Sequence, residues 1–275
     1  MMKGLKKLPV YLALGIALVV QLYPIIWVIS SSLKSKEETL ATAAYAFPKA
    51  PTLENYAMLL DSNMPEYFKN SLIVAAITLF GIVVLGLLAA YPLTKMEFRG
   101  RRQIHSFFMI GIMIPIFVSL IPMFRIYNLL GLKNTYWSLV IPQVGFAIPT
   151  ALYLYSGFLR QIPNELLEAA CLDGAGSVRS FWSIILPMMK GPIATVAIFE
   201  FVYVWNEFTF ANTFISKSEM KTVPIGLNDF INNYGLRDWG LTFAAVTATV
   251  LPTLLLFFIL NKQVISGMAA GAVKE

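Results

Sequence analysis

Long apolar stretches alternate with short polar connections along the whole chain. A helix that crosses a bilayer needs about 20 predominantly apolar residues, and six of the stretches reach that length. We therefore predict an all-α, polytopic membrane protein that forms one transmembrane domain over residues 1–275. Its six predicted spans are residues 8–29, 71–94, 104–124, 135–158, 193–216 and 239–261.

The first apolar stretch follows a basic start, as both retained spans and cleaved signal peptides do. Its apolar run continues to Ile29, well beyond the core of about 7–15 residues in a signal peptide, and no clear A-x-A cleavage site follows. We therefore interpret residues 8–29 as a retained first span. A cleaved signal peptide is the alternative.

Composition supports a membrane chain and excludes most enzyme classes. Hydrophobic residues make up 57% of the chain and charged residues 13%, whereas soluble domains contain about 45–50% and about 25%. A single cysteine, Cys171, and a single histidine, His105, exclude a disulfide framework and a two-histidine metal site. No Gly-Lys dipeptide occurs, so the phosphate-binding GxxxxGK[ST] motif is absent. We expect no catalytic residue, no metal and no cofactor bound by this chain.

Basic residues predict the orientation in the membrane. The short connection 95–103 contains Lys95, Arg99, Arg101 and Arg102, and short loops rich in Lys and Arg remain in the cytoplasm. We therefore place this connection, residues 159–192 and, with six spans, both termini in the cytoplasm. The net charge of +6 reflects this topology, so we expect contact with membrane lipid and no binding of nucleic acid.

The connection 159–192 is far longer than the roughly 2–8 residues that usually join packed helices. Pro163 and Asn164 predict the start of a short helix, with the acidic Glu168 near its positive end. The glycines within residues 174–176 predict its end. This connection therefore has helical structure of its own.

A second short helix is predicted after the glycines. Ser177 can cap it, the amphipathic residues 178–186 form it, and Pro187 ends it. Two short helices joined by a sharp turn would make a compact knob at the membrane surface.

One face of the first short helix combines small, apolar and acidic residues. Leu166, Ala169, Ala170 and Asp173 follow the i, i+3, i+4, i+7 spacing that places side chains on one face. Alanines allow close backbone approach and acidic groups attract Arg or Lys, as on a protein docking surface. The alternative is an interfacial helix on lipid headgroups, which acidic residues beside an anionic leaflet disfavour slightly.

The same connection carries a long signature. Its segment EAACLDGAGSVRSFWSIILP resembles the EAA signature of permease subunits in binding-protein-dependent ABC importers, which is E-A-A, three residues, Gly, nine residues and I-x-L-P. Other segments resemble the carbohydrate-uptake branch, specifically the maltose-type G permeases: FPKAPTLENYAMLL, NSLIVA, KMEFRGRR, WNEFTFA and SGMAAGAVKE. The signature positions that match are Glu168, Ala169, Ala170, Gly174, Ile184, Leu186 and Pro187.

The resemblance implies a type I ABC importer permease fold in a prokaryotic plasma membrane. It implies as partners a second homologous permease, a cytoplasmic ABC ATPase dimer that binds ATP and Mg²⁺, an external solute-binding protein and a sugar. Gly174 is expected at a turn with a positive φ, which a Cβ would obstruct. The ATPase-coupling residues that the resemblance implies are Glu168, Ala169, Ala170 and Gly174, with Pro187 of the same signature. We add Leu166 and Asp173, because helical spacing places them on the face of Ala169 and Ala170.

Acidic residues inside a predicted span suggest a pathway, because charges at membrane depth are costly and mark function by default. Glu200 and Glu207 lie two helical turns apart and would share one face of the fifth span. Tyr203 and Asn206 add the stacking and hydrogen-bonding groups that sugars need. Alternatively, Glu207 reaches the outer membrane surface and Glu200 pairs with a neighbouring subunit.

Two other function classes are alternatives to the permease. An ion-coupled secondary transporter would use Glu200 and Glu207 as ion sites, but it predicts internal repeats, and residues 1–134 and 135–275 show no convincing repeat. An intramembrane enzyme is disfavoured by the single histidine and single cysteine. Because the outer segments lack a basic cluster that a phosphate would demand, we expect a neutral di- or oligosaccharide as substrate.

Overall fold

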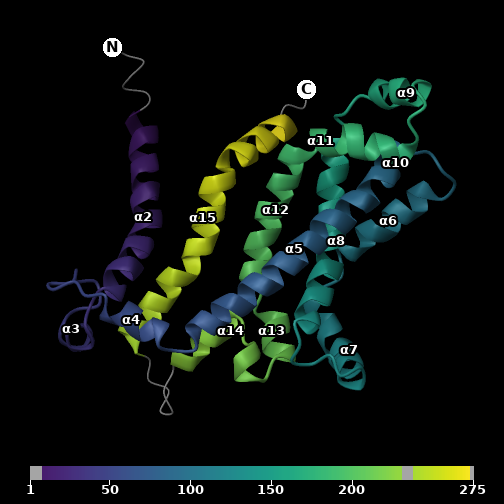
Figure 1. Cartoon of the computed structure of the whole chain (residues 1–275). Coiled ribbons are helices and arrows are strands. Elements are labelled where there is room, and N and C mark those ends of the chain that lie inside the picture. Colours follow the sequence, from purple (N-terminus) through teal and green to yellow (C-terminus); the bar gives the residue numbers. More distant parts are fainter. Residues whose placement is uncertain (1–7, 231–237, 273–275) are drawn as a thin grey trace. The chain divides into compact units, whose positions relative to one another are not determined.

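The computed structural model describes residues 8–230 and 238–272, and these residues form helices and no strand (Figure 1). The predicted all-α fold is confirmed. The longer helices are α2 (Leu8–Ser32), α5 (Met64–Lys95), α6 (Arg101–Gly111), α7 (Ile116–Leu129), α8 (Trp137–Leu159), α12 (Lys190–Trp205) and α15 (Trp239–Ala272). The shorter ones are α3 (Lys36–Ala41), α4 (Glu54–Leu60), α9 (Glu165–Leu172), α10 (Ser177–Ser180), η1 (Phe181–Ile185), α11 (Leu186–Met188), α13 (Thr209–Phe214), η2 (Ser218–Met220), α14 (Val223–Gly226) and η3 (Leu227–Phe230).

Length and composition allow five helical segments in the described residues to cross a membrane, or six if the bent pair of α6 and α7 counts as one span. The five lie close to five of the predicted spans. Their bounds are Val10–Ser32, Met64–Lys95, Trp137–Leu159, Lys190–Phe214 and Trp239–Ile259.

The third predicted span is broken, which corrects the continuous helix expected over residues 104–124. The axes of α6 and α7 differ by 93°. Pro115 precedes α7 with an extended ψ of 132°. Proline has no N–H for a helical bond and disfavours a helical conformation in the residue before it, which favours a break in the helix at Ile114 and Pro115. A Cβ on Gly111 would lie only 2.8 Å from the Cγ of Pro149, so α6 ends in close contact with α8.

The fifth predicted span is also interrupted. Because α12 ends at Trp205 and α13 begins at Thr209, residues 193–216 do not form one helix. In contrast, α8 continues through both of its prolines, Pro142 and Pro149.

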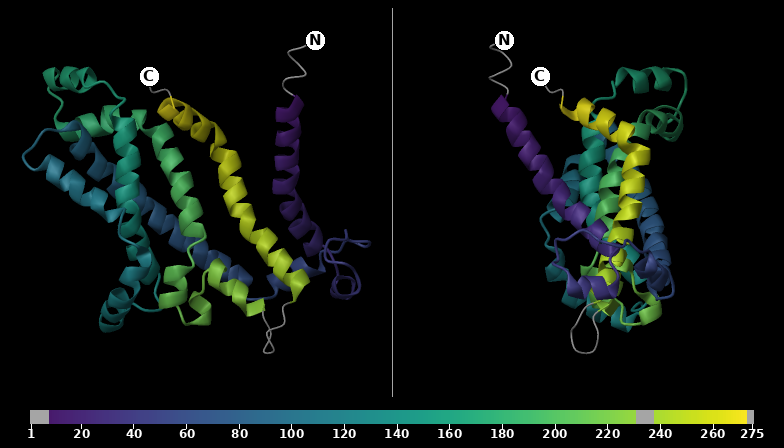
Figure 2. Two further views of the ribbon diagram at one scale, coloured as in Figure 1. Left: turned by 180° about the vertical axis from the view of Figure 1, so that it is seen from behind. Right: turned by 90° about the vertical axis from the view of Figure 1, so that its left-hand side faces the viewer.

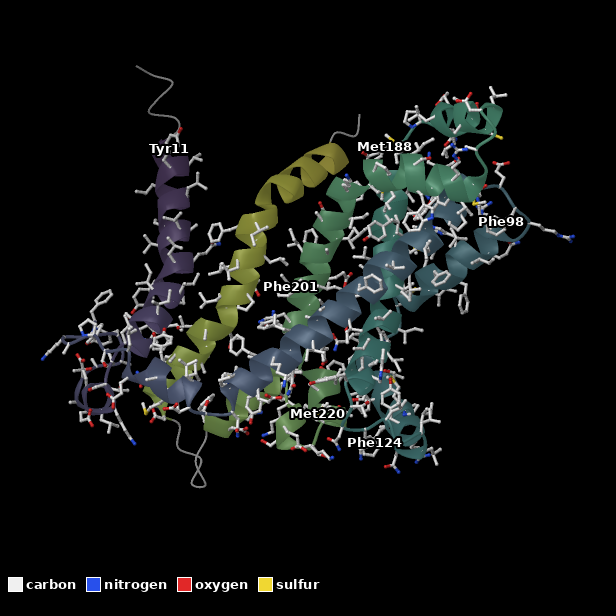
Figure 3. The ribbon with its side chains drawn as sticks, in the orientation of Figure 1. Tyr11, Phe98, Phe124, Met188, Phe201 and Met220 are labelled. Atoms are coloured by element: carbon white, nitrogen blue, oxygen red, sulfur yellow. The ribbon has the colours of Figure 1, made fainter. Side chains whose placement is uncertain are left out.

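The chain divides into two compact units, one formed by Met1–Pro65 and Gly226–Leu251 and the other by Glu66–Ile225 and Pro252–Glu275. In the first unit, apolar side chains cover all faces of α2, and Tyr11 is one of them (Figure 3). A helix that is apolar on all sides suits lipid better than water. That the whole chain acts as one transmembrane domain stays a prediction.

Asn55 organises the polar end of the first unit. Its buried side-chain amide donates hydrogen bonds to the backbone carbonyls of Ser32 and Lys34, both at 2.8 Å. The neighbouring Tyr56 hydroxyl pairs with the Ser32 hydroxyl at 2.7 Å. These bonds attach α4 to the end of α2, where the last carbonyls of a helix have no partner within the helix.

The second unit has an aromatic core between α7, α8 and α13. The rings of Tyr127 and Phe214 lie 4.9 Å apart, and Phe210 stacks on Phe214 at 6.1 Å between centroids. This packing holds α13 against α7 and α8. The buried members of the core are Val74, Tyr127, Leu139, Val140, Phe210, Ala211, Phe214, Ile215 and Ile225.

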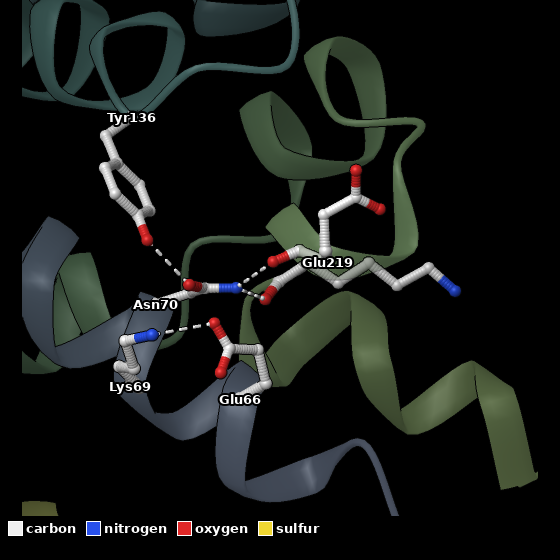
Figure 4. Close-up of polar contacts among 6 residues, drawn as sticks. Glu66, Lys69, Asn70, Tyr136 and Glu219 are labelled. Atoms are coloured by element: carbon white, nitrogen blue, oxygen red, sulfur yellow. Dashed lines mark hydrogen bonds and ion pairs between the residues drawn. The ribbon is translucent and has the colours of Figure 1, made fainter.

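Asn70 joins three segments of the second unit (Figure 4). Its amide nitrogen donates to the backbone carbonyls of Glu219 and Lys221, both at 2.9 Å, and its side-chain oxygen accepts from the Tyr136 hydroxyl at 2.7 Å. Asn70 has no exposed surface. A buried amide whose donor and acceptor are both used specifies one arrangement of its neighbours, so Asn70 fixes α5, α8 and the η2 turn relative to each other.

Candidate functional site

The connection between α8 and α12 forms a projection at one end of the second unit. Figure 1 and both views of Figure 2 show α9 beyond the ends of α8 and α12, whereas α13 lies at the opposite end of this unit. We call residues 161–189 the coupling loop. It contains every residue that the EAA resemblance singled out.

Gly174 ends α9 with a φ of +79°, the positive value expected from the sequence. The N–H of Ala175 bonds to the carbonyl of Ala170 at 2.8 Å, and the N–H of Gly174 bonds to the carbonyl of Cys171 at 3.0 Å. These two bonds form a Schellman motif, which satisfies the last carbonyls of a helix and requires a left-handed residue, usually glycine. The turn between the two halves of the coupling loop therefore depends on Gly174.

The side chains of α9 divide into an exposed set and a buried residue. Glu168, Ala169 and Asp173 are exposed, and the Leu166 side chain is 42% exposed. Ala170 is only 8% exposed, so it lies away from the surface that the other predicted coupling residues share. That Leu166, Ala169, Ala170 and Asp173 form one docking face stays a prediction, and Ala170 is its least exposed member.

The second half of the coupling loop differs from the prediction in two respects. Gly176, and not Ser177, is the cap residue before α10, and no side-chain bond caps that helix. The helical path does not end at Pro187, which is exposed in the first turn of α11 and is soon followed by α12. Because proline disrupts the regular bond pattern of the preceding turn, the chain widens into the π-helix η1, in which the Leu186 N–H bonds to the Phe181 carbonyl.

A cavity of about 440 Å³ lies between the α6–α7 break, α8 and α12. Non-helical backbone at membrane depth is tolerated only where protein buries it or where it lines a cavity, and Ile112, Ile114 and Pro115 line this one. Three of the four predicted pathway residues, Glu200, Tyr203 and Glu207, also line it. The remaining lining residues are Gly111, Ile116, Phe117, Gln143, Phe146, Ala147, Thr150, Val204 and Phe210.

Glu207 caps α13. Its two carboxylate oxygens accept hydrogen bonds from the backbone N–H groups of Phe210 at 2.7 Å and Ala211 at 3.1 Å. A carboxylate at a helix start satisfies free N–H groups and complements the positive end of the helix dipole. Asn206 lies outside the 440 Å³ cavity, lines a neighbouring groove, and donates to the Val202 carbonyl at 2.8 Å.

Glu200 and Gln143 are the two deeply buried polar side chains of the cavity. They are 7% and 6% exposed, and the side-chain oxygen of Gln143 has no hydrogen-bond partner. The helix breaks after Trp205, so the spacing of Glu200 and Glu207 along a continuous helix does not apply, but both carboxylates reach the same cavity. Among the described residues, no three His, Cys, Asp or Glu side chains gather as a metal site would require.

Residues 82–269 match the family of binding-protein-dependent transport system inner membrane components. This chain belongs to that family. It is a permease subunit of an ABC transporter, a membrane transport component and not itself an enzyme.

Curated relatives and a solved structure agree with this assignment over almost the whole permease. It is 31% identical to the trehalose/maltose transport system permease protein MalG of Thermococcus litoralis, over 98% of both chains. It is 33% identical to the diacetylchitobiose uptake system permease protein NgcG of Streptomyces coelicolor, over 93% of this chain and 85% of that one. A crystal structure of a bacterial ABC transporter involved in import of the acidic polysaccharide alginate has the same fold, with a TM-score of 0.81 at 20% identity, covering 95% and 97% of the two chains.

The last turn of α5 anchors the coupling loop of the permease, and this role was missed in the sequence. The Lys95 ammonium donates to the backbone carbonyl of Ile162 and, at 2.7 Å, to the side-chain oxygen of Asn164, the residue before α9. The Tyr91 hydroxyl donates to the Ser177 carbonyl at 3.2 Å. Lys95 lies within the KMEFRGRR segment, but its charge was interpreted only as a sign of membrane orientation.

Replacing Lys95 with methionine should loosen the start of α9. Hydrogen bonds to charged groups contribute about 1.5–3 kcal/mol, and partial exposure of Lys95 reduces this. We therefore expect trypsin to cleave after Arg160 and Arg179 about three to ten times faster in the purified variant. Arg99→Gln, which removes an exposed charge from the same connection, should leave these rates unchanged. Equal rates in Lys95→Met and wild type would show that the loop does not depend on this anchor.

Proposed function

We propose that this permease forms one half of a sugar pathway and couples it to ATP hydrolysis through α9. The other half is a second homologous permease, and a cytoplasmic ABC ATPase dimer binds ATP and Mg²⁺. An external solute-binding protein delivers the sugar. The proposal places the coupling loop and both chain termini in the cytoplasm of a prokaryotic cell, on the basis of the basic connection 95–103.

The observation that carries the proposal is the geometry of the coupling loop. A short helix stands beyond the ends of the long helices, and exposed Glu168, Ala169 and Asp173 lie on it next to a glycine-dependent turn. Small side chains allow another backbone to approach closely, and acidic side chains form charge-assisted bonds with Arg or Lys. Such a surface suits a groove on a separate protein. Leu172, with 90% of its side chain exposed, adds an apolar anchor.

The sugar class is supported by the relatives. The name of one relative mentions trehalose and maltose, and that of another mentions diacetylchitobiose. A third is the galactooligosaccharides transport system permease protein GanQ of Bacillus subtilis. We propose a neutral di- or oligosaccharide for this permease as well. Uptake should require ATP and should not depend on an ion gradient.

Co-purification tests the proposal. The affinity-tagged permease, extracted from native membranes in mild detergent, should bring a second permease and an ATPase with it. Glu168→Lys reverses an exposed charge on α9 and should remove the ATPase while the second permease remains. Glu219→Lys makes the same change at an exposed site on η2 and should keep both partners. An ATPase that stays bound to Glu168→Lys, or a permease that purifies alone and transports without ATP, would contradict the proposal.

A further inference from the structure

The connection between α3 and α4 in the first unit exposes large apolar side chains. Tyr45 and Phe47 are 73% and 68% exposed, and both lie outside the helices. No charged residue occurs between Glu38 and Lys49. We call residues 42–48 the apolar loop. Exposed apolar side chains that lie together mark a surface that contacts a membrane or another molecule.

Hydrogen bonds hold the apolar loop in a fixed shape. The Glu38 carboxylate accepts from the backbone N–H of Lys49 at 2.6 Å, which closes the base of the loop. Within the loop, the N–H of Ala46 bonds to the carbonyl of Ala43 at 2.9 Å and forms a turn. The backbone is therefore ordered while the aromatic side chains stay uncovered. A segment that is already ordered loses little conformational freedom when it binds.

Two contacts place the apolar loop beside the last turns of α2. The Trp27 indole N–H donates to the carbonyl of Ala44 at 2.7 Å. The Lys34 ammonium donates to the carbonyl of Ala43 at 3.3 Å. Trp27 precedes Ser32, the last residue of α2, by about 7.5 Å of helix rise. Because α3 lies beyond the lower end of α2 (Figure 1), the chain turns back along α2 after α3.

Aromatic contacts indicate that this level is the membrane boundary. The Trp27 ring packs edge-on against Phe243 of α15 at 5.1 Å between centroids, and Trp239 packs against the same ring at 5.8 Å. Both helices are apolar enough to cross a membrane, and two tryptophans mark their neighbouring ends. Tryptophan and tyrosine gather at the level of the lipid headgroups. The bond from Trp27 to the apolar loop brings Tyr45 close to that level.

We propose that the apolar loop is a lipid-binding surface, from which Tyr45 and Phe47 insert into the leaflet that surrounds this end of α2. The bilayer fits better than a water-soluble protein, because such a protein would first meet α3 with the exposed charges of Lys36 and Glu37. A tyrosine ring can enter the apolar region while its hydroxyl stays among the headgroups. Interfacial anchors set the depth and tilt of a membrane helix, so the loop would fix α2. This role is independent of the proposed sugar and ATPase.

Nitroxide labels on the apolar loop measure its environment. Tyr45→Cys and Phe47→Cys are each combined with Cys171→Ala, which removes the cysteine present in the chain. Glu37→Cys on α3 is the matched control. In vesicles of phosphatidylcholine and phosphatidylglycerol, both loop labels should collide more often with oxygen, which concentrates in lipid, than with a water-soluble nickel complex. The control label should show the reverse order. Loop labels that collide mainly with nickel, or that neither reagent reaches, would overturn the proposal.

Photocrosslinking in native membranes tests the same surface with every natural partner present. Replacing Phe47 with the photoreactive residue benzoylphenylalanine keeps an aromatic side chain in the apolar loop. On irradiation, the permease should gain the mass of a phospholipid. The same replacement of Glu37 should give no lipid adduct. A crosslink from position 47 to a protein, such as a solute-binding protein, or the absence of a lipid adduct there would show that the loop does not bind the bilayer.

Discussion

Replacing Gly174 with valine should strongly reduce ATP-driven transport while the permease still inserts into the membrane at normal levels. A residue with a side chain in the left-handed conformation costs about 1–2 kcal/mol, and a β-branched residue is a pronounced outlier there. At a φ of +79°, valine would therefore shift the turn to another conformation. The Schellman bonds to the carbonyls of Ala170 and Cys171 would be lost, and α10 would leave α9 in a different direction.

Gly176 provides a matched control within the same turn. Both glycines are exposed and neither has a heavy atom within 4 Å of an added Cβ, but Gly176 has a φ of −69°. Gly176→Val should therefore keep most of the transport activity. Since about 1.4 kcal/mol corresponds to a tenfold change in an equilibrium, Gly174→Val should reduce uptake in reconstituted vesicles by at least about tenfold. If the two variants transport equally, the sign of φ is not what the coupling loop requires.

The coupling loop was largely predictable because its information is local. Pro163, Asn164 and the glycines lie within a few residues of the turns they determine, and Gly174 adopts the expected conformation. The burial of Ala170 was not predictable in the same way. Helical spacing predicts which residues share a face of α9 but not how much of that face is exposed. The exposed width depends on how closely α10 packs against α9.

The break between α6 and α7 was not predictable from its own sequence. Two prolines lie close together in this region, and α7 continues through Pro122 but begins only after Pro115. Proline is tolerated in membrane helices when neighbours satisfy the freed backbone groups. What distinguishes the two sites is tertiary contact, since Gly111 lies against Pro149 of α8 at the end of α6. The cap formed by Glu207 escaped prediction for the same reason, because it exists only where the helix is interrupted.

Replacing Asn70 with leucine should give the largest loss of stability among the predicted variants. Leucine has a similar size but no donor or acceptor, so the Tyr136 hydroxyl and the carbonyls of Glu219 and Lys221 all lose the Asn70 bond. Losing a partner costs a buried polar group about 1–3 kcal/mol. A total of about 3 kcal/mol would lower the Tm of the purified permease by about 6–12 °C, if it follows the scaling of soluble domains of similar size.

Tyr136→Phe is the matched control, because it removes one of the three bonds and leaves Asn70 in place. Its Tm should fall by only about 2–4 °C. If Asn70→Leu is no less stable than Tyr136→Phe, the two bonds to the η2 turn do not hold this end of the unit together.

The Asn70 and Glu168 variants should separate the scaffold from the docking surface. Asn70 joins residues 149 and 151 positions away in the sequence, at the end of the second unit that carries η2 and lies opposite α9. Asn70→Leu should therefore lower thermal stability while the folded fraction still binds the ATPase. Glu168→Lys changes an exposed residue without a bond to the scaffold, so it should remove the ATPase without lowering the Tm. If either variant both lowers the Tm and removes the ATPase, the coupling loop and the scaffold are linked more tightly than the contacts in the second unit indicate.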